Sequence, residues 1–204
     1  MLKIGIFGGT FDPIHLGHIH LANEVFEQCK LDMIYFIPCY HSAHNKPIIA
    51  TPSQRLDMLH LAVNSPEFYI DDREIKCGQV SYTIDTLQSL RGDLPNADFY
   101  LIMGADAFLK FNTWRDWRRI LALTNVIIAD REEVRESTIL SSSIYLDAKA
   151  IIEHAHNKIA LVKIKPLPVS ATQIRSLVKE GKNASYLLPE KVWQYIITNQ
   201  LYCS

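Results

Sequence analysis

The sequence has few cysteines, and none of them are spaced to act together. Only four of its 204 residues are cysteines, and no two form a Cys-x-x-Cys pair. The spacing therefore argues against a zinc ribbon or a dithiol redox motif. We expect Cys29, Cys39, Cys77 and Cys203 to be free, reduced thiols, as is typical of cytosolic proteins.

A large charge of one sign, long apolar runs, repeats and low-complexity tracts are also missing. The 21 basic and 22 acidic residues give a formal net charge of −1. Such a chain has no overall attraction to nucleic acid or anionic membranes, so any phosphate ligand needs a local site. Without a charged leader or a long apolar run, the sequence predicts a cytoplasmic protein with neither a signal peptide nor a membrane span. Monomer and homodimer both stay open.

Short apolar stretches alternate with amphipathic ones along most of the chain. Stretches rich in Ile, Val, Phe and Tyr predict strands at 2–8, 33–38, 68–75, 99–103, 126–129 and 159–164. Apolar residues at three- and four-residue spacing predict helices at 17–29, 53–63, 83–90, 114–121 and 144–154. This alternation predicts an α/β fold with a Rossmann-like, doubly wound, mainly parallel sheet. Such sheets bind ligands beyond the carboxyl ends of their strands.

The alternation of strands and helices stops after residue 164. Two prolines make 165–169 extended, and helices are predicted at 171–180 and 189–198, with Pro189 at a first helical position. We interpret 1–165 as a Rossmann-like core and 166–204 as a small C-terminal helical segment packed on it. The two parts are expected to form a single functional domain.

The segment after the first strand is the richest in chemistry. Gly8 and Gly9 allow the backbone to approach a ligand, and Pro13 stiffens the turn before a helix. The N-terminus of a helix presents unpaired N–H groups and partial positive charge, which suit a phosphate. His15 and His18 share one face of the first turn and can donate hydrogen bonds to phosphate oxygens. The alternative is that these histidines only cap the helix or pack against it.

Two neighbours complete this first motif. Gly17 is predicted to leave room for a flat ring such as adenine, and His20 is predicted to be a packing residue. The segment His15-Leu-Gly-His18, preceded by Gly-Thr-Phe-Asp-Pro, resembles the signature of the nucleotidylyltransferase superfamily, which includes phosphopantetheine and cytidylyl transferases. The resemblance implies that both histidines contact the ATP phosphates and stabilise the transition state.

A second anion site is predicted where the chain leaves the last strand. Ser170 is a good N-cap, Thr172 adds a hydroxyl, and Arg175 can bind phosphate bidentately. An ordinary capped helix with a surface arginine is the alternative. The stretch 169–175 is similar to the superfamily's second motif, Ser-Ser/Thr-Thr-x-x-Arg, with Ala171 in place of the second hydroxyl residue. The resemblance implies binding of the β- and γ-phosphates.

The middle of the chain is expected to select the acceptor. Ser81 or Tyr82 is predicted to begin a helix whose N–H groups near Thr83 can receive a carboxylate. After the fourth strand, Asp106 is placed to accept hydrogen bonds from ribose hydroxyls or an adenine amino group. Trp114 is placed to stack on an aromatic base, with helix packing as the alternative. For Trp117 packing is the favoured interpretation.

Five motifs in order resemble the bacterial nicotinate-nucleotide adenylyltransferases over residues 3–202. They include Ser81-Tyr-Thr-x-Asp-Thr-Leu, Gly104-x-Asp, a tryptophan pair and a final Leu-Tyr. The resemblance implies that the Thr83 backbone binds the nicotinate carboxylate and that Trp114 stacks on the pyridine ring. After the second strand the family has Pro-Pro-His-Lys or Pro-Pro-His-Arg. Here His44 aligns and the basic residue Lys46 lies one position later.

The expected reaction joins ATP to nicotinate mononucleotide, with Mg²⁺ carried by ATP and no dedicated metal site. Asp12 is expected to orient the loop or a metal-bound water. The catalytic residues are predicted to be His15, His18 and Arg175. The residues predicted to bind ATP are Gly8, Gly9, Thr10, Phe11, His15, Gly17, His18, Gly104, Asp106, Ser170, Thr172 and Arg175. Those predicted to bind the acceptor are Asp12, His44, Lys46, Ser81, Tyr82, Thr83 and Trp114.

Other functions remain open from the sequence. A related adenylyl or cytidylyl transferase, such as a phosphopantetheine adenylyltransferase, shares the first motif but lacks the patterns at 81–87 and 186–202. Nicotinamide mononucleotide is a second possible acceptor. A non-catalytic nucleotide-binding regulator is the alternative from another class, and the intact His15, His18 and Arg175 argue against it.

Overall fold

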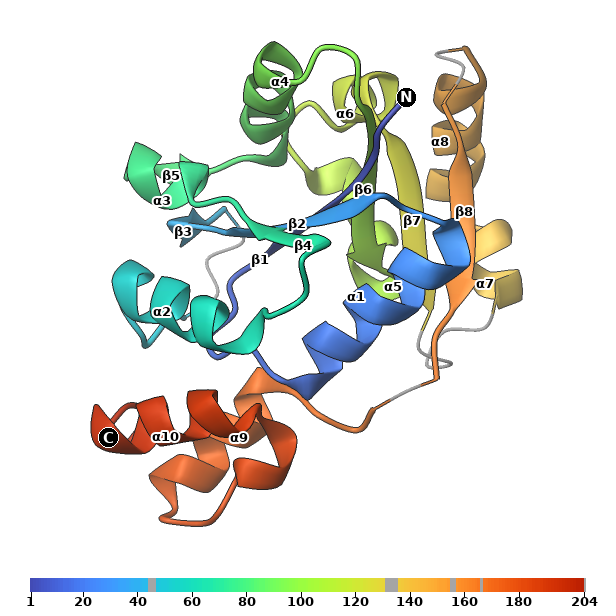
Figure 1. Cartoon of the computed structure of the whole chain (residues 1–204). Helices are drawn as coiled ribbons and strands as arrows, with labels where there is room; N and C mark the ends of the chain where they lie inside the picture. The colour runs from blue at the N-terminus through green and yellow to red at the C-terminus, as the bar shows by residue number, and fades with distance from the viewer. Residues whose placement is uncertain (44–46, 131–135, 155–156, 166, 204) are drawn as a thin grey trace.

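The centre of the protein is a six-stranded parallel sheet. The structure is a computed structural model that describes residues 1–43, 47–130, 136–154, 157–165 and 167–203 (Figure 1). The strands lie in the order β4-β2-β1-β6-β7-β8, and every neighbouring pair is parallel. Their bounds are β1 Lys3–Gly9, β2 Met33–Pro38, β4 Phe68–Ile70, β6 Asp98–Gly104, β7 Asn125–Asp130 and β8 Ile159–Lys163. This order confirms the predicted Rossmann-like fold and places its topological switch point between β1 and β6.

Helices cover both faces of this sheet. One face carries α1 (Leu16–Cys29), α2 (Pro52–Ala62), α9 (Ala171–Lys179) and α10 (Glu190–Thr198). The other carries α4 (Thr83–Asp93), α5 (Ala105–Phe108), α6 (Trp117–Leu123), α7 (Glu136–Leu140) and α8 (Ser143–His154). Side chains alternate along β7: Ile127 faces the first group of helices, whereas Val126 and Ile128 face the second. A sheet buried on both faces explains why its strands read as continuous apolar runs. None of the described helices has the length and apolar composition needed to cross a membrane.

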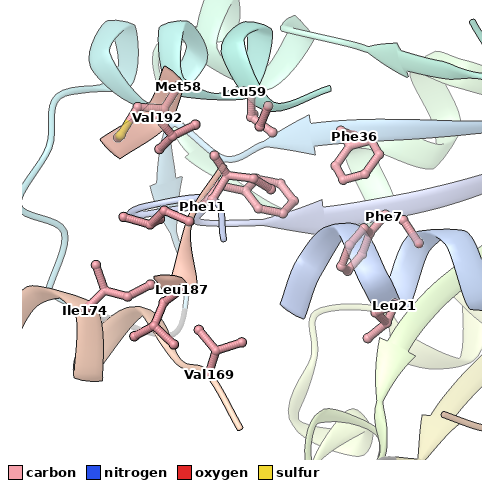
Figure 2. Close-up of a cluster of buried hydrophobic side chains, with 14 of the residues drawn as sticks. Phe7, Phe11, Leu21, Phe36, Met58, Leu59, Val169, Ile174, Leu187 and Val192 are labelled. Carbon is pink, nitrogen blue, oxygen red and sulfur yellow. The ribbon is translucent and has the colours of Figure 1, made fainter. Parts of the chain in front are cut away.

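The C-terminal helices share a hydrophobic core with the sheet. Val169, Ile174, Leu187 and Val192 pack in one cluster with side chains of β1, β2, α1 and α2 (Figure 2). A short 3-10 helix, Ser185–Leu187, joins α9 to α10. The segment therefore packs on the core as expected, while the proposed boundary at residue 165 stays a prediction.

The strand predicted at 68–75 is wrong in its second half. β4 ends at Ile70, because the Asp71 carboxylate accepts a hydrogen bond from the Arg73 N–H at 3.0 Å and turns the chain into α3 (Arg73–Cys77). A two-stranded parallel sheet, β3 (His41–Ser42) and β5 (Val80–Ser81), was not foreseen either. It joins the loop after β2 to the start of α4.

Two predicted helix starts also need correction. The helix predicted from Trp114 begins at Trp117, after a 3-10 helix at Phe111–Thr113, because Asp116 has a left-handed backbone with φ of 51°. Pro189 occupies the N-cap before α10 rather than its first helical position. The first of these shifts leaves Trp114 outside the helix.

Candidate active site

A cavity of about 750 Å³ opens at the carboxyl ends of β1 and β6, the switch point of the sheet. Its volume lies in the range that suits a nucleotide-sized ligand. The predicted site residues that the structure brings together on its wall are Gly8, Gly9, Thr10, Ser81, Tyr82, Thr83, Gly104, Asp106 and Trp114. Residues predicted for ATP and residues predicted for the acceptor thus line one cavity.

The loop after β1 packs on a buried aromatic side chain. A Cβ on Gly9 would lie 2.8 Å from the ring of Phe11, so only glycine fits there. A Cβ on Gly8 would meet nothing within 4 Å, because that residue faces the open cavity. Phe11 is buried, adopts φ of 49° and packs edge-on to His18 at 5.1 Å. Its ring supports the loop from the core, so any contact of Phe11 with ATP falls to its backbone.

The two histidines of the first motif form a stacked pair at the start of α1. Their ring centroids lie 3.7 Å apart with the planes 26° from parallel. The His15 N–H donates to Nδ1 of His18 at 3.3 Å, which places the proton of a neutral His18 on Nε2. His15 is also the N-cap of α1. The capping role and the phosphate-binding role are therefore compatible.

These histidines and Arg175 lie beside the cavity and not on its wall. The His18 ring is 6.1 Å from the ring of Phe7, which does line the cavity. Arg175 reaches the same region from α9, where its Nη1 donates to the Asp12 carbonyl at 2.8 Å. His15 and Arg175, which belong to the two predicted motifs, are 160 residues apart in the sequence. The fold brings them together at the starts of α1 and α9.

The structure explains the glycine at position 17 by a different contact from the predicted one. A Cβ there would lie 2.7 Å from Cγ1 of Val169 and 3.2 Å from the His15 ring. The missing side chain therefore lets the chain before α9 approach α1, and the space predicted for adenine is filled by protein. At the start of α9, Ser170 caps the helix as expected by accepting from the Gln173 N–H at 3.2 Å. Ser170 and Thr172 are both exposed to solvent.

Asp12 serves the loop itself. Its carboxylate accepts hydrogen bonds from the N–H groups of Ile49 and Ala50 at 2.8 and 3.1 Å and from the Tyr202 hydroxyl at 2.7 Å. It is 3% exposed and does not line the cavity. The geometry thus favours the predicted loop-orienting role, and it gives the predicted contact with the acceptor no support.

A buried arginine supports the same loop and was missed by the sequence analysis. Arg55 of α2 is fully buried, and it donates to the carbonyls of Thr10 and Tyr40 at 2.8 and 3.0 Å. It joins the loop after β1 to the loop after β2. In the sequence Arg55 reads as an ordinary polar position of an amphipathic helix, so no local signal marks it.

The acceptor end of the cavity is formed by α4 and the segment around Trp114. Tyr82 is the N-cap of α4, as predicted, so the first-turn N–H groups of Thr83 and its neighbours begin at the cavity wall. Trp114 is half-buried and packs edge-on to Phe111 at 5.1 Å. Trp117 is buried in the core, which confirms its packing role.

Among the described residues, four further titratable side chains line the cavity: Cys39, Glu74, Lys110 and Arg115. Burial raises the pKa of the Cys39 thiol, and burial also raises the pKa of the Glu74 carboxyl. The Arg115 guanidinium lies 4.7 Å from the centre of the Tyr82 ring and pairs with Asp85 at 3.2 Å. Glu74 was hidden from the sequence analysis because its segment had been predicted as a strand.

His44 and Lys46 lie outside the described residues. Within the ranges that are described, no group of three or more His, Cys, Asp or Glu side chains is arranged to hold a metal ion. All four cysteines belong to the described part of the chain and are free thiols, as predicted. His20 contacts the Lys165 carbonyl at 2.8 Å, consistent with packing.

Known proteins resemble this chain over its full length. The cytidylyltransferase-like family model matches residues 6–177. A protein of Hydrogenovibrio crunogenus is 40% identical over 98% of this chain and 97% of its own length. One of Dictyoglomus turgidum is 40% identical over 99% of this chain and 96% of its own length. Both carry the name "Probable nicotinate-nucleotide adenylyltransferase".

Solved structures agree with the fold. The Plasmodium falciparum nicotinic acid mononucleotide adenylyltransferase complexed with NaAD has a TM-score of 0.80 at 20% identity, over 99% of this chain and 98% of its own. The same protein complexed with APC has a TM-score of 0.76 at 19% identity, over the same shares of both chains. By sequence, the chain belongs to the cytidylyltransferase-like family and, within it, to the nicotinate-nucleotide adenylyltransferases.

Proposed function

We propose that the protein transfers the adenylyl group of ATP to nicotinate mononucleotide, giving nicotinate adenine dinucleotide and pyrophosphate in the synthesis of NAD. The carrying observation is full-length identity of 35–40% to relatives named as nicotinate-nucleotide adenylyltransferases. The cavity at the switch point supports it, because its wall combines a glycine loop with a helix start and a tryptophan.

ATP is assigned to the β1 side of the cavity. The triphosphate would run along the open backbone at Gly8 towards the stacked pair of His15 and His18. The capped start of α9 and the Arg175 guanidinium would hold the β- and γ-phosphates. Asp106, exposed beside Gly104 at the end of β6, would accept hydrogen bonds from the nucleoside.

The acceptor is assigned to the α4 side. The nicotinate carboxylate would accept hydrogen bonds from N–H groups at the start of α4, near Thr83, where the helix dipole also favours an anion. The ring of Trp114 would stack on the pyridine ring. Lys110 and Arg115 add positive charge to the same cavity. These features together favour an acid over an amide as the acceptor.

The chemistry needs no general base. A phosphate monoester is already nucleophilic near neutral pH, so its oxygen attacks the α-phosphorus in line, a new P–O bond forms, and the bond to pyrophosphate breaks. The protein's part is to position both nucleotides and to stabilise the charge on the transferring and leaving phosphates. His15, His18 and Arg175 supply that stabilisation. Mg²⁺, held mainly by ATP itself, would neutralise part of the triphosphate charge.

A panel of acceptors tests this function. Pyrophosphate release from ATP is measured in parallel with nicotinate mononucleotide, nicotinamide mononucleotide and phosphopantetheine. We expect release with nicotinate mononucleotide to exceed release with the other two. Faster release with another acceptor would refute the assigned substrate, and no release with any of them would favour a nucleotide-binding protein without this activity.

A further inference from the structure

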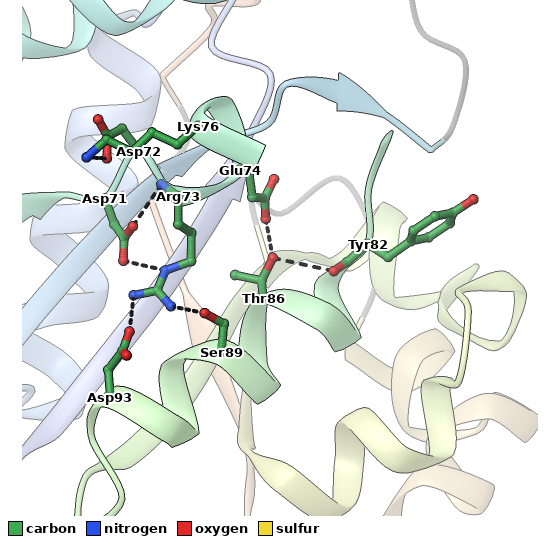
Figure 3. A network of polar contacts seen from close by, with 9 residues as sticks. All are labelled: Asp71, Asp72, Arg73, Glu74, Lys76, Tyr82, Thr86, Ser89 and Asp93. Atoms are coloured by element: carbon green, nitrogen blue, oxygen red, sulfur yellow. Dashed lines mark hydrogen bonds and ion pairs between the residues drawn. The ribbon is translucent and has the colours of Figure 1, made fainter. Parts of the chain in front are cut away.

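A carboxyl group reaches the acceptor end of the cavity from α3. Glu74 lines the cavity together with Ser81 and Thr86, although no residue of α3 is fully buried. Figure 3 shows the Glu74 side chain pointing from α3 to Thr86 of α4. Thr86 Oγ1 donates to Glu74 Oε1 at 2.5 Å, and the side chains of Ser81 and Glu74 are also hydrogen-bonded. Glu74 itself is assigned to neither ATP nor the acceptor.

The directions of these hydrogen bonds are fixed by their other partners. Ser81 Oγ accepts the Tyr40 N–H at 3.1 Å, and its own hydrogen points to Glu74. Thr86 has one hydroxyl hydrogen, and the Tyr82 carbonyl at 3.4 Å is the more distant acceptor. Both hydroxyl hydrogens are therefore directed at Glu74, which must accept both hydrogen bonds.

This carboxyl joins two segments that flank the acceptor end. Ser81 ends β5, which pairs with β3 in the loop after β2. Thr86 lies on α4, one turn beyond Thr83. Glu74 therefore holds the peptide groups from Ser81 to Thr83 between two anchored side chains. Those peptide groups are the ones to which the nicotinate carboxylate is assigned.

Stability alone does not explain a carboxyl at this place. Burial raises the pKa of Glu74, the nearby Asp71 raises it further, and Ser81, Thr86 and Arg73 act in the opposite direction. Burial is the largest cause of the raised pKa of Cys39, and the Glu74 charge adds to it. At neutral pH a group with a raised pKa is less stable ionised in the folded protein than in the unfolded chain. An amide would avoid that penalty.

We propose that Glu74 is a positioning residue for the acceptor: by taking the hydrogens of Ser81 and Thr86 it orients the N–H groups at the start of α4 towards the nicotinate carboxylate. The inference rests on the proposed function, whose acceptor carries that carboxylate. Glu74 acts through the α4 start and takes no part in the transfer itself.

A neighbouring residue provides the matched control. Arg73 also joins α3 to α4, through Ser89 at 2.7 Å and Asp93 at 3.0 Å, and it pairs with Asp71 at 2.8 Å (Figure 3). These contacts lie away from the cavity wall. A variant at Arg73 therefore loosens the same helix and leaves the hydrogen bonds of Glu74 to Ser81 and Thr86 in place.

The test compares Glu74→Gln with Arg73→Met and the unchanged protein. Steady-state pyrophosphate release gives KM for nicotinate mononucleotide, KM for ATP and kcat, and thermal unfolding at pH 7 gives stability. The Gln side chain keeps one acceptor oxygen and replaces the other with an NH2 group, which donates and cannot accept. We expect Glu74→Gln to raise KM for nicotinate mononucleotide roughly tenfold, or about 1.4 kcal/mol, with KM for ATP and kcat within about twofold. Its unfolding temperature should stay close to that of the unchanged protein, because relief from burying a charge offsets the weakened hydrogen bonding.

A second variant isolates the proposed route. Thr86→Val removes one of the two hydroxyls, so the double variant with Glu74→Gln should raise KM by less than the product of the single effects. Arg73→Met should lower the unfolding temperature and leave KM for nicotinate mononucleotide unchanged.

The outcomes separate the two claims. If the unchanged protein is active and Glu74→Gln leaves this KM unchanged, the positioning role is wrong while the proposed function stands. The same holds if Glu74→Gln lowers stability and kcat without a selective rise in KM, as a plain tether would. If the unchanged protein does not use nicotinate mononucleotide, the proposed function fails, and the role of Glu74 fails with it.

Discussion

The hydrogen bond between Tyr202 and Asp12 ties the C-terminus to the loop that precedes the histidine pair. Tyr202 is 3% exposed, and its hydroxyl donates to Asp12 Oδ1 at 2.7 Å. The same carboxylate orders the chain at Ile49 and Ala50, and the Asp12 carbonyl accepts from Arg175. The change Tyr202→Phe removes only the hydroxyl and keeps the ring, so it isolates this bond.

The expected loss follows from the type of bond. A hydrogen bond to a charged group contributes about 1.5–3 kcal/mol, and the two remaining N–H donors keep the carboxylate partly satisfied. We therefore expect Tyr202→Phe to lower the free energy of unfolding by about 2 kcal/mol. For a chain of this size, that corresponds to a fall of roughly 4–8 °C in Tm.

Thermal and urea unfolding at pH 7 measure this loss. Tyr186→Phe is the matched control, because Tyr186 belongs to the same C-terminal segment but is 64% exposed. That control should change stability by less than about 0.5 kcal/mol. A Tyr202→Phe variant as stable as the control would refute the idea that this bond anchors the loop.

The pH dependence gives a second readout of the same bond. Burial, the Asp12 charge and the hydrogen bond to Asp12 all raise the pKa of Tyr202. A raised pKa means that the contribution is complete below the pKa of an unfolded tyrosine, about 10, and declines as the pH rises above it. The stability difference between the unchanged protein and Tyr202→Phe should be constant from about pH 7 to 9 and shrink above about pH 10.

Three further substitutions test other parts of the site. Gly17→Ala places a Cβ 2.7 Å from Val169 and should cost about 1–3 kcal/mol of stability, measured by urea unfolding. Arg55→Met leaves two loop carbonyls without their charged donor and should cost at least about 3 kcal/mol in the same measurement. Trp114→Leu should raise KM for nicotinate mononucleotide about 3- to 10-fold and leave KM for ATP unchanged in the pyrophosphate assay. An unaltered KM would contradict the stacking role.

The sequence predicted what depends on local periodicity and on short motifs. The order of strands and helices followed from apolar spacing, and the strand 33–38 was placed with its observed bounds. The helix predicted at 83–90 begins at its observed residue, and the cap at Ser170 followed from its residue type. These features could be predicted because each is decided by neighbours in the chain.

What the sequence missed depends on contacts between distant segments. Arg55 matters because the carbonyls of two separate loops converge on it, which no pattern in α2 reveals. Glu74 was misplaced because a side-chain turn at Asp71 ends β4 early, against the apolar pattern of the stretch. Gly17 was assigned to a ligand, although the chain before α9 fills the space beside it.

Identification of the product is a direct test of adenylyl transfer to nicotinate mononucleotide. The protein is incubated with ATP, Mg²⁺ and nicotinate mononucleotide, pyrophosphate is quantified, and the nucleotide product is identified by mass spectrometry. We expect nicotinate adenine dinucleotide and pyrophosphate in equal amounts, and a loss of both by orders of magnitude in a folded His18→Ala variant. Release of pyrophosphate without the dinucleotide, or near-normal turnover in His18→Ala, would contradict it.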